Sequence, residues 1–215
     1  VGIEIEVEFQ EANPSVPKEI SSIWSSKGDN SLRFIGREYV TNGAQPLGKE
    51  LEDSLDVLCD KINKSGPVKE SPRTSVHVHI NVTDLPVTSL WSGVCGFWLL
   101  ENLLVNYCGD HRESNLFCFR LQDTEGILRY VEKDLKSTKP FGKHLNTDHV
   151  RYAALNLNAI AKFGSVESRS MRGITDAKEI YDWASLVHGV VHNAAKTHKN
   201  PGLLLDHYFK SSRED

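Results

Sequence analysis

Three segments of the sequence place acidic, basic or imidazole side chains at every second position. In the first, residues 2–8, Glu4, Glu6 and Glu8 alternate with apolar residues. Side chains alternate between the two faces of a strand, so a strand here would carry all three carboxylates on one face, about 6.5–7 Å apart. Mg²⁺ and Mn²⁺ prefer carboxylate oxygens and would relieve the repulsion between them. The same alternation is also typical of the solvated face of a half-buried strand.

The second segment, residues 75–82, places His77, His79 and Asn81 between apolar residues. On a strand, two imidazoles at this spacing point the same way, and they could supply nitrogen ligands to a metal or donors to a phosphate. The alternative is a pair of exposed histidines at the edge of a sheet.

The third segment, residues 164–172, contains Glu167 and Arg169 on one face of a possible strand. A metal-binding carboxylate and a phosphate-binding guanidinium would then be neighbours. The alternative is an exposed ion pair, which contributes at most about 1 kcal/mol.

The elements that must position these residues follow from hydrophobic periodicity and turn signals. Expected strands cover 1–9, 32–41, 75–82, 150–158 and 164–171. Expected helices cover 48–64, 90–107, 125–135, 176–196 and 203–209. Long helices between strands that lack tight hairpins indicate an α+β fold, with a largely antiparallel sheet and helices on one face. The sequence has no repeat or long linker, so we expect a single domain over 1–215.

Composition excludes several classes of protein. The 215 residues are 39% hydrophobic and 25% charged, which is typical of a globular protein, and the formal charge is −4. No long Lys/Arg run is present, so we expect no broad nucleic-acid surface. The apolar stretch at 90–107 contains Glu101 and two asparagines, so we expect a buried helix and no membrane span. The four cysteines have no CxxC spacing and no signal-peptide pattern is visible, so we expect reduced thiols in the cytoplasm.

Taken in order, these segments resemble the amidoligase family of phage and bacterial proteins, over residues 1 to about 185. The resemblance lies in Gly2-Ile3-Glu4-Ile5-Glu6, Asp29-Asn30-Ser31-Leu32, Glu38-Tyr39-Val40, His77-Val78-His79-Ile80, Arg112-Glu113-Ser114-Asn115, Arg151-Tyr152-Ala153-Ala154-Leu155-Asn156 and Val166-Glu167-Ser168-Arg169. The family usually has an aromatic residue where Ser168 stands, and that departure concerns packing against the helix layer more than chemistry.

The resemblance implies a glutamine-synthetase-like catalytic domain, in which a curved antiparallel sheet carries helices on its convex face and the active site on its concave face. It implies an ATP- and Mg²⁺- (or Mn²⁺-) dependent ligase that joins a carboxylate to an amine through an acyl phosphate. The metal ligands it implies are Glu4, Glu6, Glu38, His77 and Glu167. His79 would lie close to the nucleotide, Arg169 would meet phosphate or the acyl intermediate, and Arg112 and Arg151 would make further phosphate or substrate contacts.

Other aspects of function stay open at this point. A remaining carboxylate such as Glu8 could accept the proton of the amine. A metal-dependent hydrolase with the same Glu/His cluster and a non-catalytic binding protein are alternatives to a ligase. The sequence lacks a Walker loop, which excludes a P-loop kinase. The expected partners are small-molecule or peptide carboxylates and amines, in the cytoplasm of a host cell if the chain is phage-encoded. The oligomeric state is open.

Overall fold

The chain folds around a six-stranded sheet in which every pairing is antiparallel. The computed structural model describes residues 1–69, 71–113, 115–121, 125–136, 145 and 148–211, so Ser114 of the family-like segments lies outside the described residues. The strand order is β2-β3-β1-β4-β6-β5. The strands are β1 (Gly2–Phe9), β2 (Trp24–Gly28), β3 (Ile35–Thr41), β4 (Ser75–Asn81), β5 (Leu155–Asn156) and β6 (Ser165–Arg172). The predicted α+β fold with an antiparallel sheet is confirmed.

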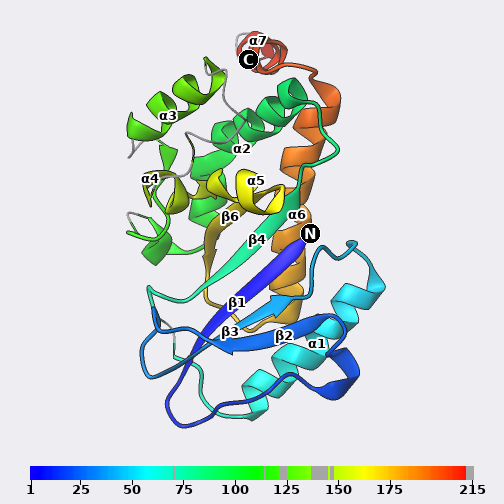
Figure 1. Cartoon of the computed structure of the whole chain (residues 1–215), viewed down its shortest axis with the longest axis vertical. Coiled ribbons are helices and arrows are strands. Elements are labelled where there is room, and N and C mark those ends of the chain that lie inside the picture. Colours follow the sequence, from blue (N-terminus) through cyan, green and yellow to red (C-terminus); the bar gives the residue numbers. More distant parts are fainter. Residues whose placement is uncertain (70, 114, 122–124, 137–144, 146–147, 212–215) are drawn as a thin grey trace.

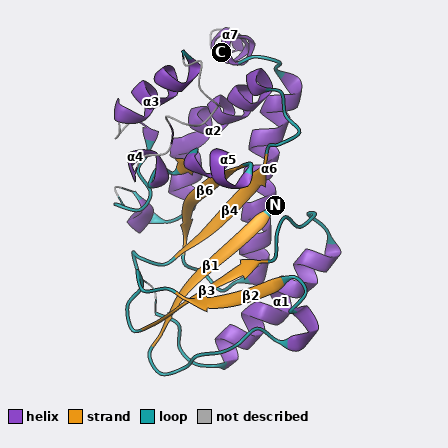
Figure 2. Ribbon diagram, in the orientation of Figure 1, coloured by secondary structure: helices purple, strands orange, loops and turns teal. Residues whose placement is uncertain are grey.

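Helices lie on both faces of this sheet (Figures 1 and 2). They are α1 (Lys49–Lys64), α2 (Val87–Tyr107), α3 (Glu125–Leu135), α4 (Asp148–Arg151), α5 (Asn158–Phe163), α6 (Ala177–Thr197) and α7 (Pro201–Ser211), with 3₁₀ turns η1 (Lys18–Ile20) and η2 (Asp110–Arg112). In the view of Figure 1, α1 and α6 lie behind the sheet and α5 lies in front of it. Helices therefore do not keep to one face, because α5 packs beside β6 on the other. No described helix is both long and apolar enough to cross a bilayer.

The apolar members of the alternating segments form the core on the side of α1 and α6. Ile3, Ile5 and Val78 are at most 1% exposed. The stripe of α1 that includes Leu55 and Ile62 is fully buried in the same core. Burial of this face fixes the register of each strand, because a slip by one residue would turn every polar side chain into the core.

Helices α2 and α6 approach closely at two glycines of α2. A Cβ atom at Gly93 would lie 2.7 Å from the carbonyl oxygen of Val191, and one at Gly96 would lie 2.6 Å from the Cβ of Ala194. Side chains of ordinary size cannot occupy these positions without separating the two helices.

Two parts of the secondary structure differ from the sequence prediction. Residues 150–158 were expected as one strand, but they form the end of α4, the two-residue strand β5 and the start of α5. Strand β2 was not expected, because its residues Trp24–Gly28 lack apolar alternation. It is held by pairing with β3 and by Trp24, whose buried indole Nε1–H donates to Ser54 Oγ at 2.9 Å. The single-domain and glutamine-synthetase-like descriptions stay predictions.

Candidate active site

Glu4 and Glu6 project from the face of β1 opposite the core. Ile3 and Ile5 occupy the core face, so the alternation of β1 places both carboxylates on the other side. Glu6 is buried, and 22% of the Glu4 side chain is exposed. Burial raises the pKa of Glu6. The sheet therefore holds two adjacent carboxylates where water solvates them poorly.

His77 on β4 joins these carboxylates to β6. Its Cα pairs with that of Glu4, and its Nδ1 lies 3.1 Å from Glu4 Oε1 and 3.3 Å from Glu167 Oε1. Its Nε2 lies 2.6 Å from Ser75 Oγ, whose hydroxyl donates to Glu6 Oε2 at 2.6 Å. Burial lowers the pKa of His77 to about 4, and the charge of Arg169 acts in the same direction. The imidazole is therefore neutral near pH 7, the form in which histidine binds metals.

Glu167 and Arg169 lie together on β6, as their spacing predicts. Arg169 donates from Nη1 to Glu167 Oε1 at 2.6 Å, and Asn156 Nδ2 donates to Glu167 Oε2 at 2.6 Å. Burial alone would raise the pKa of Glu167, but His77, Arg169 and His79 together lower it to about 2. The opposite charge and the hydrogen bonds keep this carboxylate ionised.

A β-bulge sets the position of Arg169. Val76 pairs with Met171 and Val78 pairs with Ser168, so Arg169 and Ser170 together lie opposite the single residue His77. Bulges redirect side chains and are frequent beside active sites. Here the bulge brings Arg169 Nη1 to 3.5 Å from His77 Nδ1.

Arg112 does not line the site, and the prediction that it contacts phosphate or substrate is wrong for this structure. Its side chain is 0% exposed. Its Nε donates to the carbonyl oxygen of Ser170 at 2.9 Å, and its Nη2 donates to that of Arg169 at 2.6 Å. Arg112 thus binds the backbone of the bulge from within the protein and supports Arg169 indirectly.

Glu38 and Glu8 have different surroundings. Glu38 on β3 pairs with Glu6 in the sheet and forms an ion pair with Lys27 Nζ at 3.0 Å. Burial raises the pKa of Glu38 to about 7, and its hydrogen bond with Glu4 adds to this rise. Glu8, by contrast, is 1% exposed, and its Oε1 accepts a hydrogen bond from the backbone N–H of Arg33 at 2.7 Å. Glu8 does not line the cavity, so the suggestion that it accepts the proton of the amine is wrong.

The donor set fits a divalent cation. Glu4, Glu6 and His77 each offer a ligand atom, and these atoms lie within 4.8 Å of one another. Glu38 and Glu167 border this group, so several carboxylates and one imidazole share a small volume. Such a set, rich in carboxylate oxygen, suits Mg²⁺ or Mn²⁺ better than a metal that prefers thiolates.

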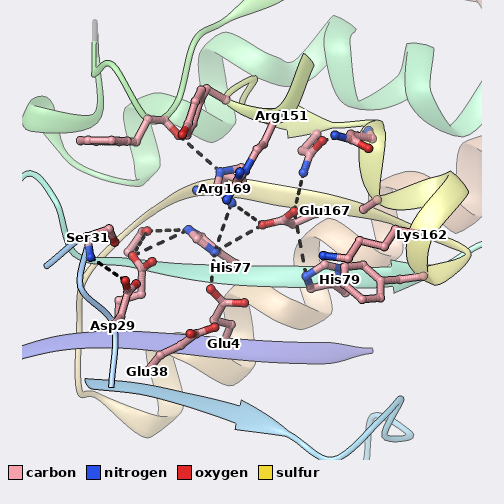
Figure 3. A pocket seen from close by; sticks show the side chains of 18 of the residues that line it. Glu4, Asp29, Ser31, Glu38, His77, His79, Arg151, Lys162, Glu167 and Arg169 are labelled. Carbon is pink, nitrogen blue, oxygen red and sulfur yellow. Dashed lines mark hydrogen bonds and ion pairs between the residues drawn. The ribbon is translucent and has the colours of Figure 1, made fainter. Parts of the chain in front are cut away.

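This polar wall faces a cavity of about 700 Å³ (Figure 3). Glu4, Glu6, Glu38, His77, His79, Arg151, Glu167 and Arg169 all line it, so the structure brings together every predicted site residue except Arg112. His79 pairs with Glu167 across the sheet, and its Nδ1 lies 3.0 Å from Ser165 Oγ. Burial lowers the pKa of His79.

Sequence reasoning missed several residues of this cavity. Among them are Lys27, Arg73, Phe117 and Lys162. Isolated cations and a single phenylalanine carry no periodic pattern, so no local signal identifies them. Arg73 and Phe117 lie in turns, Lys27 lies on β2 and Lys162 lies on α5. Neither β2 nor α5 was predicted from the sequence.

A second cavity of about 540 Å³ adjoins the first. The two cavities share Glu4, Lys27, Glu38, His79 and Phe163. Beyond these residues, small and apolar residues line much of the second cavity, including Gly2, Val40 and Ala44. The acidic cluster therefore stands between a charged chamber and a more apolar one.

The comparison with known families agrees with this geometry. The family described as "Putative amidoligase enzyme" matches residues 45–191, well over half of the chain. The chain belongs to this amidoligase family. No match was found among curated proteins. The match includes β4, β6 and α5, so it covers His77, His79, Glu167 and Arg169, whereas Glu4 and Glu6 lie before it. Membership in the family supports a ligase.

Proposed function

We propose that this amidoligase joins a carboxylate to an amine and uses ATP to activate the carboxylate. One observation carries the proposal: acidic residues from β1, β3 and β6 meet His77 and Arg169 on one wall of a cavity of about 700 Å³. A cavity of this size is in the range of small-molecule sites. The combination of clustered carboxylates with cations suits a polyphosphate that arrives with divalent metal.

Under this proposal Glu4, Glu6 and His77, with Glu38 and Glu167 beside them, hold Mg²⁺. Mg²⁺ would neutralise phosphate charge and orient the reacting phosphoryl group. Hydrogen bonds within the protein already position these ligands. Ser75 Oγ is hydrogen-bonded to both Glu6 and His77, and Asn156 Nδ2 donates to Glu167. Preorganised ligands of this kind need little rearrangement during the reaction.

The basic residues would complete the phosphate site. Arg169 is held by Glu167 and by the bulge, so its remaining guanidinium N–H groups can donate to anionic oxygens. Arg151 and Lys162 line the same cavity. The second cavity, with Val40, Ala44 and Phe163 on its walls, suits the nucleoside, because it is more apolar and joins the first cavity at His79.

The reaction proposed has two steps. In the first, a carboxylate oxygen of the substrate attacks the γ-phosphorus of ATP and the bond to ADP breaks, which gives an acyl phosphate. In the second, the nitrogen of the amine attacks the acyl carbon, the C–N bond forms, and inorganic phosphate leaves with the C–O electron pair. The amine loses a proton in this step. Phosphoryl transfer depends mainly on positioning and charge stabilisation, which the clustered side chains could provide.

The test is thermal unfolding with Mg²⁺ and a non-hydrolysable ATP analogue, followed by a screen for ADP release with pooled carboxylates and amines. We expect the analogue to raise the melting temperature of the wild type but not of Arg169→Gln or Glu4→Gln. Glu50→Gln, at an exposed position on α1, is the matched control and should respond like the wild type. ADP release should require both a carboxylate and an amine. Absence of a nucleotide-dependent shift, or ester or peptide cleavage without nucleotide, would contradict the proposal.

A further inference from the structure

One guanidinium at the edge of the main cavity has no role in the phosphate site described above. Arg73 lines this cavity together with Asp29 and Ser31, and its Nη1 donates to the carbonyl oxygen of Ser31 at 2.9 Å. Figure 3 shows Asp29 and Ser31 on one side of His77, with His79 and Lys162 on the other. Arg73 therefore belongs to the end of the cavity that lies away from Lys162.

Arg73 differs in its pairing from two other cations of the cavity. Lys27 lies 3.0 Å from Glu38, and Arg169 lies 2.6 Å from Glu167. Within the described residues, no carboxylate forms an ion pair with Arg73, although Asp29 lines the same end. Among the described residues, the only hydrogen bond of the Arg73 guanidinium is the one to the Ser31 carbonyl oxygen, which orients it and leaves its other N–H groups available to a ligand. An oriented guanidinium of this kind matches the two oxygens of a carboxylate.

The position of Arg73 makes it a poor candidate for a nucleotide contact. The more apolar second cavity opens at Glu4, Glu38 and His79 and contains Phe163, and neither Arg73 nor Ser31 lines it. A nucleotide with its nucleoside in that cavity would reach the acidic cluster from the side of His79. The opposite side, where Arg73 lies, is then left for the substrate that carries the reacting carboxylate.

We infer that Arg73 binds a second carboxylate on the substrate whose first carboxylate reacts at the acidic cluster. This inference rests on the proposed function and names the substrate class of the same site, namely dicarboxylates. Asp29 and Arg73 both contact Ser31 and line the same cavity, and the negative charge of Asp29 should weaken the binding of an anion there. Arg73 and Asp29 are therefore predicted to change dicarboxylate affinity in opposite directions.

The experiment measures binding by calorimetry at fixed free Mg²⁺, with the ATP analogue present and absent. The probes are the series of dicarboxylates from malonate to pimelate, each compared with the monocarboxylate of equal carbon number. We expect at least one dicarboxylate to bind the wild type about tenfold or more tighter than its monocarboxylate partner, since a charge-assisted hydrogen bond has roughly this effect. Arg73→Gln should remove the difference. Arg73→Lys should retain part of it, because the charge remains without the planar fork.

Asp29→Asn is the matched variant of opposite sign. Its amide oxygen can still accept the hydrogen bond that Asp29 Oδ1 takes from the backbone N–H of Ser31, so the turn should be retained. We expect this variant to bind the same dicarboxylate tighter than the wild type. If no dicarboxylate is preferred, or if the preference survives in Arg73→Gln, the inference is wrong.

Failure of this inference can be separated from failure of the proposed function by the affinity for the ATP analogue. Arg73→Gln should leave that affinity within about threefold of wild type, because Arg73 lies away from the proposed nucleoside cavity. A loss of about tenfold or more would mean that Arg73 contacts the nucleotide, which overturns the inference and leaves the ligase proposal intact. If the wild type binds no nucleotide, the ligase proposal fails, and the inference fails with it whatever dicarboxylates do.

Discussion

The side chain of Arg112 supports Arg169 by binding the backbone of Arg169 and not its guanidinium. Its Nη2 donates to the carbonyl oxygen of Arg169 at 2.6 Å, while the guanidinium of Arg169 points into the cavity toward Glu167. Two arginines that both resemble phosphate-binding residues in sequence thus have different functions in the fold. One presents its charge to the cavity, and the other holds the bulge that makes this presentation possible.

Replacement of Arg112 by methionine should lower the free energy of unfolding. The carbonyl oxygens of Arg169 and Ser170 would lose their donors inside the protein, and an unsatisfied buried group costs about 1–3 kcal/mol. We expect a total loss of roughly 2–5 kcal/mol, measured by urea unfolding. Arg33→Met is the control, because the Arg33 side chain is exposed, and it should stay within about 0.5 kcal/mol of wild type. If Arg112→Met keeps full stability but loses nucleotide binding, Arg112 acts directly on the ligand.

This difference between the two arginines also shows what sequence alone could predict. The alternation in β1, β4 and β6 is local, so it correctly assigned one face of each strand to the core and the other to polar residues. Arg112 could not be interpreted in this way, because the bulge depends on how β4 pairs with β6, and Arg112 lies 57 residues before its partner Arg169. A buried arginine and a phosphate-binding arginine look alike in a sequence.

The same limit applies to the edges of the site. Residues 150–158 contain apolar residues that suggested one strand, yet the ladder includes only Leu155 and Asn156, and α5 follows at once. Lys162 reaches the cavity only because this short helix turns over the sheet. Arg73 depends on the turn that contains Ser31 in the same way. Single cations brought in by tertiary contacts leave no periodic signal.

Mg²⁺ should stabilise the protein through Glu4. Without metal, Glu4 disfavours the ionised forms of Glu6 and Glu38, because it raises the pKa of both. Glu4→Gln should therefore leave the metal-free protein as stable as wild type or more so. Added Mg²⁺ should raise the melting temperature of the wild type. At a concentration 100 times its dissociation constant, Mg²⁺ should increase the free energy of unfolding by about 2.7 kcal/mol. The variant should need about tenfold more Mg²⁺ for the same shift.

The exposed Glu50→Gln variant controls for nonspecific effects of charge and should respond to Mg²⁺ as the wild type does. Calorimetric titration of the chelator-treated protein provides an independent measurement. An unchanged Mg²⁺ response in Glu4→Gln would remove Glu4 from the metal site.

Glu38 should make the metal-free protein less stable as the pH rises. Burial raises its pKa from 4.5 to about 7, so the folded state favours the protonated carboxyl. This contribution is complete below about pH 4.5 and is lost as the pH rises through about 7. His77 has the opposite sign, because its pKa is lowered to about 4. The informative quantity is therefore the free energy of unfolding of the wild type minus that of Glu38→Gln. This difference should decrease as the pH rises from about 4.5 to above about 7.

Urea unfolding with a chelator at several pH values measures this difference. Lys27→Gln is the companion variant, since Lys27 lowers the pKa of Glu38 and its removal should enlarge the dependence on pH. A difference that stays constant across the range would show that Glu38 titrates normally in the folded protein.

The contact between α2 and α6 should not tolerate a side chain at Gly93. A Cβ there would lie 2.7 Å from the carbonyl oxygen of Val191 and 3.0 Å from its Cγ1, so Gly93→Ala must push the helices apart. Overpacking of this kind costs about 1–3 kcal/mol, which exceeds the gain of up to about 1 kcal/mol from the higher helix propensity of alanine. Gly189→Ala on α6 is the matched control, because its nearest neighbour is the flexible Asn193 side chain at 3.9 Å, so only the gain should remain. Urea unfolding of the two variants should therefore give changes of opposite sign, and equal changes would mean that the helices are not in contact at Gly93.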